Sequence, residues 1–493
     1  PSLIRRYWKR CDAKLCNYPL AVGRSYGKDH EMGQRHQCRA TKNGRDQEMA
    51  NHITRRQALG ATAALLAAPA LVRQANAQSR FDWKRFAGER IEVTLQTSPR
   101  GLLLQRQNKE FEDLTGIRCG IEVVPEQQHR QKIIVEYASG RPSFDVAELS
   151  LHVNKRQVGK ARWNTDIKAL IADSSITAPD FDFADFGAGM VQYATQADGR
   201  MDSLPAFADY FILYYNKELL AAKNIAVPTT WDGMFEAARA LTEPSRQIYG
   251  HVGRGLKNAN VVLWSSYLLG TAQRDMINAN RQLITDTDDA IWAGEMYKKF
   301  LRDVSPPGSI GFNWNECQTT FMQGRAAMWI DGIGFAAPLE DRQRSRVAGK
   351  VGYALVPKGR GANHHCCLFG AGYGIPEASR KKGPAWLYLQ WALGKENQLR
   401  MLTSGAGVPA RSSPFGNEAA IAASTFPREF FNTLGESAKI ARAGLPEIVP
   451  VTQFRDVIGT ALTNTISGSD VATELRRATA EFRPVLEQSE RES

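Results

Sequence analysis

Apolar and polar positions recur with two different periods along the chain after residue 89. Short apolar or alternating runs are typical of strands, and apolar residues three or four apart are typical of helices. The first three predicted strands are residues 90–96, 117–124 and 144–149, and the helices between them are residues 102–114 and 131–139. This order predicts an α/β layer with a parallel sheet.

The loops after these strands are the first candidate binding region. Ligands of open parallel sheets bind beside the carboxyl ends of the strands. In this chain those ends lead into the loops that hold Thr97, Ser98 and Arg100, residues 126–128 and residues 148–152. We therefore expect polar side chains of these loops to face a ligand.

A dense apolar run, residues 204–220 (LPAFADYFILYYNKELL), predicts a buried strand that leads into a helix. Asp209 precedes the most apolar part, where it either caps an exposed end or serves as a placed hydrogen-bonding group. Beyond this run the pattern predicts helices at 228–241, 286–300, 313–324, 381–402 and after 450, and strands at 326–330 and 351–357.

Length and composition indicate a globular protein of more than one lobe. The 493 residues exceed what one hydrophobic core usually holds, and 43% are hydrophobic and 23% charged. The formal net charge is +12, but residues 1–77 contain 14 of the 63 Lys and Arg and only 5 of the 51 Asp and Glu. The remainder is nearly balanced, so the charge does not indicate a nucleic-acid partner.

The basic N-terminal part contains two different segments. Residues 1–48 are polar and lack a sustained apolar period, and Met49 is followed at once by a targeting pattern. We interpret residues 1–48 as a leader that is either disordered or upstream of the true translation start.

Residues 49–77 resemble a signal peptide of the twin-arginine type. Arg55 and Arg56 precede the uncharged apolar stretch 58–72, and Ala75 and Ala77 form a small-residue cleavage site. This stretch is shorter than the roughly twenty residues that span a bilayer, although a membrane anchor and ordinary unfolded export are the alternatives. We expect cleavage near Ala77 and a periplasmic location.

Four cysteines lie beyond the leader: Cys119, Cys317, Cys366 and Cys367. An oxidising compartment permits disulfides, and four cysteines allow three pairings. His364 and His365 beside Cys366 and Cys367 suggest a metal site. Neighbouring side chains on a strand point to opposite faces, however, so these four do not converge on one ion, and we predict no metal and no cofactor.

Five stretches, taken in order, resemble the extracellular solute-binding proteins of carbohydrate ABC importers, in the maltose-binding-like family 1. They are residues 139–146 (SGRPSFDV), 204–219, 228–232 (PTTWD), 324–332 (GRAAMWIDG), and 370–376 followed by 385–391. Two positions depart from the family pattern: Phe144 is inserted before Asp145, and Gly233 replaces the usual acid.

The resemblance implies a two-lobed periplasmic-binding-protein fold of type II, with a ligand cleft between lobes joined by crossing strands. It assigns residues 78–207 plus 333–368 to the first lobe and 208–332 plus 369–493 to the second. The implied function is capture of a sugar or polyol by hinge closure and its delivery to the membrane subunits of the importer. We expect a monomer.

Sugars have apolar C–H faces that pack on aromatic rings and hydroxyls that need donors and acceptors. On this chemistry, and on position near the predicted crossings or loops, the ligand-binding candidates are Trp264, Asp209, Trp329, Asp331, Arg411, Glu148, Tyr373 and Arg100. For Trp264 and Trp329 the alternative is core packing, for Asp209 a surface acid, and for Arg411 a solvated loop charge.

Two other functions remain open. One is a secreted carbohydrate-active hydrolase, whose carboxylate pair need not be close in sequence. The chain has no GxSxG, HExxH or P-loop motif, so we predict a non-enzyme. The other is a binding protein for a non-sugar solute such as a polyamine or an iron chelate, which cleft acids would favour and aromatic crossings would not.

Overall fold

The computed structural model describes residues 81–361 and 363–491, which belong to a compact unit spanning Asn76–Ser493. The predicted leader and signal peptide lie outside the described residues. Within the described residues, no helix is both long and apolar enough to cross a membrane.

The N-terminal part forms the predicted parallel layer. Strand β1 (Arg90–Gln96) pairs in parallel with β2 (Arg118–Val124) and with β3 (Val146–Ser150), and helices α3 (Pro99–Thr115) and α4 (Glu126–Ala138) connect them. Ser98 caps the start of α3. Gly116 ends that helix in the left-handed conformation (φ 71°), which glycine adopts without a steric penalty. These elements confirm the order expected from the apolar pattern.

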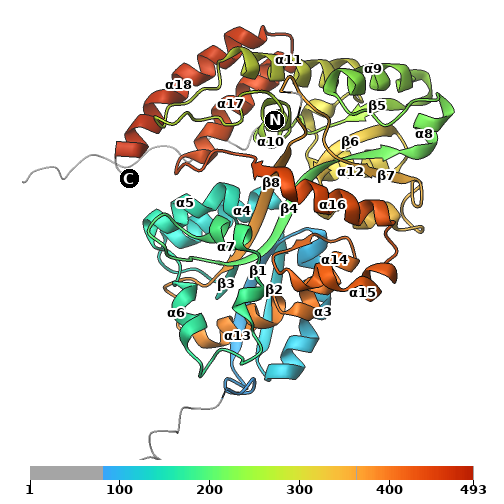
Figure 1. Cartoon of the computed structure of the whole chain (residues 1–493). Helices are drawn as coiled ribbons and strands as arrows, with labels where there is room; N and C mark the ends of the chain where they lie inside the picture. The colour runs from blue at the N-terminus through green and yellow to red at the C-terminus, as the bar shows by residue number, and fades with distance from the viewer. Residues whose placement is uncertain (1–80, 362, 492–493) are drawn as a thin grey trace, which may run out of the picture. The chain divides into compact units, whose positions relative to one another are not determined.

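Two long antiparallel strands connect this layer to the rest of the sheet. Strand β4 (Leu204–Asn216) pairs with β8 (Cys366–Gly374), and β8 also pairs with β3. The order along the sheet is β2-β1-β3-β8-β4-β6-β5. Figure 1 shows β4 and β8 running side by side through the middle of the unit.

The far half of β4 belongs to a second group of strands. There β4 pairs antiparallel with β6 (Ala326–Gly332) and with β7 (Val351–Ala354), and β6 pairs in parallel with β5 (Tyr249–Val252). The helices of this group are α8 (Lys217–Ala222), α9 (Trp231–Leu241), α10 (Asn260–Leu268), α11 (Asp288–Asp303) and α12 (Trp314–Met322). Thr230 and Thr287 cap α9 and α11 with their side chains, as threonines at these positions predict.

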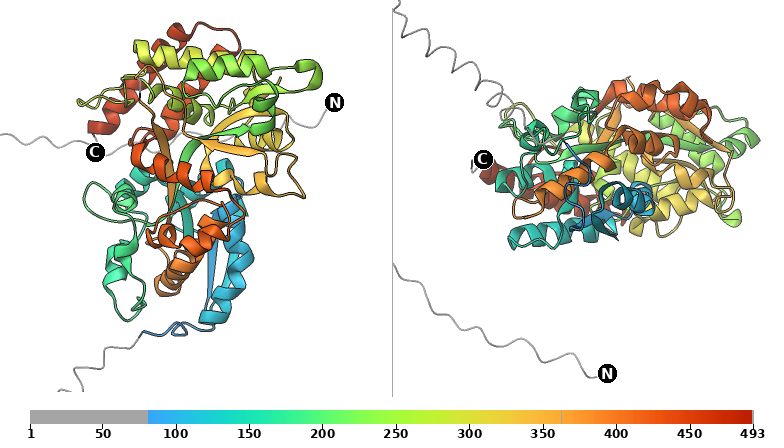
Figure 2. Two further views of the ribbon diagram at one scale, coloured as in Figure 1. Left: turned by 45° about the vertical axis from the view of Figure 1, so that its right-hand side comes forward. Right: turned by 90° about the horizontal axis from the view of Figure 1, so that it is seen from below.

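The C-terminal helices divide between the two groups of strands. Helix α13 (Lys382–Ala392) contacts α3 and β1 and is followed by α14 (Lys395–Thr403), whereas α17 (Val451–Ile466) and α18 (Val471–Arg491) contact each other and α11. In Figure 2 the orange helices accompany the blue segment, and the red C-terminal helices accompany the yellow-green ones. The sequence-based lobe boundaries had assigned all of 369–493 to the second lobe.

Five further α-helices and two short strands complete the list of these elements in the described part of the chain. They are helices α5 (Leu151–Ala161), α6 (Ile167–Ala172), α7 (Ala188–Ala194), α15 (Glu418–Ala422) and α16 (Arg428–Ile440), and strands β9 (Val408–Pro409) and β10 (Ala441–Ala443).

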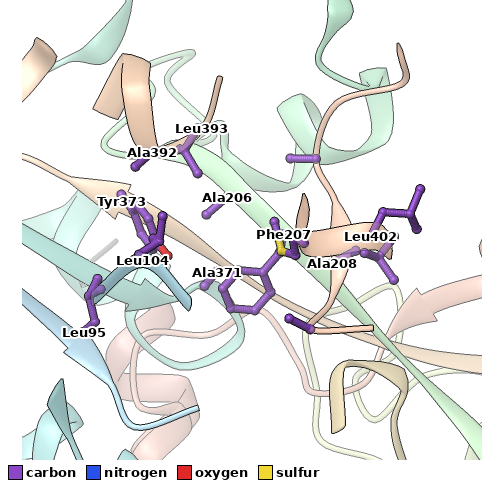
Figure 3. Packing of buried hydrophobic residues seen from close by; sticks show 14 of the residues in the cluster. Leu95, Leu104, Ala206, Phe207, Ala208, Ala371, Tyr373, Ala392, Leu393 and Leu402 are labelled. Carbon is purple, nitrogen blue, oxygen red and sulfur yellow. The ribbon is translucent and has the colours of Figure 1, made fainter. Parts of the chain in front are cut away.

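Buried apolar residues of β1, α3, β4 and β8 pack together on the layer that contains β1. Figure 3 shows Leu95, Leu104, Phe207 and Tyr373 among them. A separate cluster joins α9, α10, α11, α17 and α18. The four cysteines are buried free thiols, so none of the three possible disulfide pairings is formed.

Candidate functional site

A cavity of about 60 Å³ lies against the central strands β4 and β8. Its lining comes from both groups of strands and combines charged side chains with aromatic rings. The lining residues are Gln96, Thr97, Ser98, Arg100, Glu126, Arg130, Glu148, Ser150, His152, Phe207, Asp209, Phe211, Arg254, Val262, Trp314, Phe335, Phe369, Gly370, Ala371 and Arg455. The loops expected to face a ligand, at the ends of β1, β2 and β3, all contribute.

Glu148 enters the cavity from the carboxyl end of β3. Its Oε2 accepts a hydrogen bond of 3.0 Å from the backbone N–H of Gln96 at the end of the neighbouring strand β1. The residue is only 1% exposed. Burial raises the pKa of Glu148 to about 7, although Arg100, the Gln96 N–H and Arg130 all favour the charged form.

Arg100 and Asp209 form an ion pair across the cavity wall. Arg100 lies in the first turn of α3 and its Nη1 is 3.3 Å from Oδ2 of Asp209 on β4. The guanidinium also lies 3.9 Å from the centre of the Phe207 ring. The other carboxylate oxygen of Asp209 accepts a 2.9 Å bond from the N–H of Gly334, so the acid is a placed hydrogen-bonding group rather than an exposed cap.

A second ion pair stands where β5 and β6 end. Arg254 donates from Nε to Oδ2 of Asp331 over 2.8 Å and from Nη2 to Oδ1. Asp331 also accepts a 2.8 Å bond from the N–H of Gly332 and is fully buried. Burial lowers the pKa of Arg254, but the Asp331 carboxylate outweighs this effect and the pKa is raised. Arg254 lines the cavity, whereas Asp331 stands behind it.

The start of α4 contributes Glu126 and Arg130. Arg130 Nη2 lies 2.7 Å from Glu126 Oε1 one turn away, and the indole Nε1 of Trp314 donates to Glu126 Oε2 over 3.1 Å. The Trp314 ring stacks on Phe335 with centroids 4.6 Å apart. Burial raises the pKa of Glu126, but the surrounding arginines, Arg130 first, lower it to about 2.

The C-terminal helix α17 contributes Arg455 to the lining of the cavity. Its Nε and Nη2 donate to the backbone carbonyl of Asn258 over 3.2 and 2.8 Å. The residue is 3% exposed. Burial, followed by repulsion from Arg130, lowers the pKa of Arg455 to about 9.

The structure places three of the eight predicted binding residues in the cavity lining: Arg100, Glu148 and Asp209. Asp331 reaches the site only through Arg254. Trp264 is 0% exposed inside α10, a helix buried on every side, and Trp329 stacks on Tyr214 within the sheet (centroids 4.9 Å apart). Both rings therefore pack in the core, which was the alternative to ligand binding considered for them.

Tyr373 and Arg411 are also buried outside the lining. Arg411 donates to the carbonyls of Leu393 (2.6 Å) and Phe181 (2.8 Å), pairs with Asp185 and lies 4.1 Å from the Phe186 ring centre. It is neither solvated nor near the cavity, and its contacts hold surrounding loops together.

The cavity also contains residues that sequence reasoning missed. Arg254 follows β5 at its carboxyl end, and the rule that pointed to the earlier loops would have found it. Arg455 lies between the buried positions Phe454 and Ile458 of an amphipathic helix. A charged residue on this buried face is the local feature that could have indicated a site residue. Among the described residues, no group of three or more His, Cys, Asp or Glu side chains is arranged to hold a metal ion.

With this geometry in place, comparison with known proteins defines the class. A family model described as bacterial extracellular solute-binding protein matches residues 97–399. The chain belongs to this family, which confirms the resemblance read from the five stretches.

Individual relatives and structures agree on the architecture. The chain is 26% identical to the erythritol/L-threitol-binding protein of Mycolicibacterium smegmatis over 80% of this chain and 86% of that protein. A ribitol complex of a solute-binding protein from Agrobacterium radiobacter superimposes with a TM-score of 0.75 at 23% identity, covering 81% and 99% of the two chains. Maltose-bound MalE3 of T. maritima gives 0.73 at 20% identity, over 81% and 100%. The predicted two-lobed α/β fold is confirmed.

Proposed function

We propose that the mature protein is the solute-binding component of an ABC importer and that it captures a small sugar or polyol in the cavity beside β4 and β8. The observation that carries this proposal is the composition of the lining: ordered Arg and carboxylate groups face the same cavity as the rings of Phe207, Phe211 and Phe369. Rings of this kind cover the C–H faces of a polyhydroxylated solute, and the charged groups bond its hydroxyls. The names of the similar proteins add support, since erythritol, ribitol and maltose share this chemistry.

Binding would proceed by hinge closure about β4 and β8. Strand β8 pairs with β3 of the first group, β4 pairs with β6 of the second, and β4 and β8 pair with each other, so bending these two strands alters the opening of the cavity. The contacts of α13 with α3 and β1 favour assigning residues 382–403 to the first lobe rather than to the second, to which the sequence-based boundaries assign them. The closed monomer, in the periplasm after cleavage near Ala77, would then dock on the membrane subunits of the importer without a metal or cofactor.

The two alternative functions fit this cavity less well. A polyamine would bring its positive charges against Arg100, Arg130, Arg254 and Arg455, which all line the cavity. For a hydrolase, the carboxylates Asp209 and Glu126 have both oxygens engaged by donors of the protein. A catalytic acid or base needs an oxygen that can reach the substrate.

A thermal-shift screen of the mature protein against sugars, polyols, polyamines and amino acids tests the proposal. We expect a concentration-dependent rise in Tm with a sugar or polyol and none with polyamines. Assays with chromogenic glycosides run in parallel, and turnover by the purified protein would overturn the binding-protein assignment. A shift produced only by polyamines or amino acids would also contradict the proposal.

A further inference from the structure

Two guanidinium nitrogens of the cavity lining, Arg100 Nε and Arg130 Nη1, are buried without a hydrogen-bond partner among the described residues. Arg130 shows this directly. Its Nε donates to Ser150 Oγ over 3.0 Å and its Nη2 lies 2.7 Å from Glu126 and 3.1 Å from His152 Nε2. Its Nη1 is buried and has no hydrogen-bond partner within the described residues. The side chain is only 8% exposed, so this donor is largely shielded from bulk solvent.

Arg455 forms no ion pair with any of the residues that the structure describes. Its only hydrogen bonds within the described part of the chain go to the uncharged carbonyl of Asn258. Its neighbour Asp456 bonds instead with Asn258 Nδ2 and Lys257. A buried charge without an opposite charge is costly, and the pKa of Arg455 is lowered first by burial and then by repulsion from Arg130.

The carboxylates near these arginines are already occupied. Glu126 accepts from Arg130 on one oxygen and from Trp314 and Asn313 on the other. Asp331 is held by Arg254 and the N–H of Gly332. Glu148 forms no ion pair among the described residues, and its raised pKa leaves it only partly charged near pH 7. Within the described part of the chain, no carboxylate therefore pairs directly with Arg455.

We infer that the solute carries an oxyanion, a carboxylate or a phosphate, on a short polyhydroxylated chain, and that this group binds between Arg130 and Arg455. A hydroxyl brings a proton together with its lone pairs and so supplies a further donor to a site that already holds unpartnered donors. An oxyanion brings only acceptors and a negative charge, and its bonds to guanidinium groups are the stronger, charge-assisted kind. The inference rests on the proposed function, because it narrows the sugar or polyol to its acidic derivatives.

The experiment compares solutes that differ only in one terminal group. Calorimetric titration of the mature protein uses ribitol, ribonate and ribitol 5-phosphate, and the matching set built on erythritol. We expect at least one acid to bind about tenfold or more tightly than its parent alcohol, with the carboxylate and phosphate arms identifying which oxyanion fits. The acid's affinity should also fall with added NaCl more steeply than the alcohol's.

Variants then test the site itself. Arg455→Met should abolish the preference for the acid, so that the ratio of the acid's affinity to the alcohol's falls to about one, and Arg455→Lys should keep part of the preference because it keeps the charge. Arg477→Met, in an exposed ion-paired position on α18, is the control and should change neither. A preference that survives in Arg455→Met would contradict the assigned position.

The comparison of alcohols with acids uses the unmodified protein, so its outcome does not depend on whether any variant folds. If an alcohol binds as tightly as both of its acids, the inference is wrong and the proposed function stands. If no alcohol or acid of either series binds and the thermal-shift screen finds no sugar or polyol, the proposed function fails and this inference fails with it.

Discussion

The indole nitrogen of Trp314 donates a hydrogen bond to the carboxylate of Glu126 over 3.1 Å. Glu126 opens α4, which contacts β1 and β3, whereas Trp314 opens α12, which contacts β6. The bond therefore joins the two groups of strands directly beside the cavity, without using the crossing strands. Lys155 and Glu447, 3.1 Å apart, form a second such link between α5 and the segment after β10.

Removing the Trp314 donor should weaken ligand binding. Trp314→Phe keeps a ring against Phe335 but loses the bond to Glu126, which is worth about 1 kcal/mol net or more because the acceptor is charged. We expect a rise in Kd of about fivefold for the tightest solute of the screen, measured by calorimetry. Trp292→Phe, on α11 and away from the cavity, serves as the control; equal affinities in the two variants would show that the bond does not contribute to closure.

Asp331→Asn should destabilise the protein before any ligand is added. The substitution leaves the buried Arg254 guanidinium without its counter-ion, and breaking a buried pair in this way costs about 3–5 kcal/mol. Chemical unfolding of the ligand-free protein measures the loss. The matched control is Glu236→Gln, whose pair with Arg239 has side chains 67% and 62% exposed and should contribute less than about 1 kcal/mol. A loss no greater than that of the control would contradict the role of Asp331 as the partner that holds Arg254.

Glu148 should make stability depend on pH in the neutral range. The unfolded chain ionises this group near 4.5 and the folded chain near 7, so the folded state holds more protons between these values. The free energy of unfolding therefore decreases as pH rises through this window, by on the order of 3 kcal/mol in total. Glu148→Gln removes the titrating group and retains an oxygen that accepts from Gln96.

The measurement is the difference in unfolding free energy between wild type and Glu148→Gln at several pH values. Buried histidines also make stability change below about pH 6.5; burial lowers the pKa of His251, for example, to about 3. This contribution is the same in both proteins, so it cancels in the difference between them. The variant should gain on the wild type as pH rises from 5 to 8. A difference that stays constant would mean that Glu148 titrates normally.

Trp264→Ala should cost about 3–5 kcal/mol of stability, because it opens a cavity in a helix buried on all sides. This expectation reverses the sequence-based prediction, in which the ring stacked on the ligand. Urea unfolding of the ligand-free variant measures the effect, with the half-buried Trp292→Ala for comparison. A variant that kept its stability and lost only ligand affinity would restore the stacking role.

The periodic pattern was sufficient to predict strands and helices such as β1 and α3 because each of them carries a local signal, whereas the two-lobed fold was predicted from the family resemblance. The runs around β1, α3, β4 and β6 are apolar, capped and ended by residues that act over a few positions, such as Ser98 and Gly116. The packing side of a helix is a tertiary property, and so the attachment of α13 to α3 could not be read from the order of motifs.

The site was only partly predictable for a related reason. Arg100, Asp209 and Glu148 stand at strand ends, where topology alone brings side chains together. Tryptophan is also the residue type that stacks on sugars, so the sequence alone does not distinguish Trp264 and Trp329 from ligand-binding rings. Only their burial in the structure shows that they belong to the core. Arg455 reaches the cavity from more than two hundred residues beyond β4, and nothing in its own helix shows what that helix faces.

The pairing of β3 with β8 has a consequence for how the chain is assembled. Ala147 faces Gly374 in this antiparallel pair, so the N-terminal layer lacks its neighbouring strand until most of the chain has been synthesised. Contacts of such long sequence separation form slowly, because the intervening loop must close first. The open edge of β3 is meanwhile a template for strands of other chains, and a chaperone that shields residues 146–150 during synthesis would suppress the resulting aggregation.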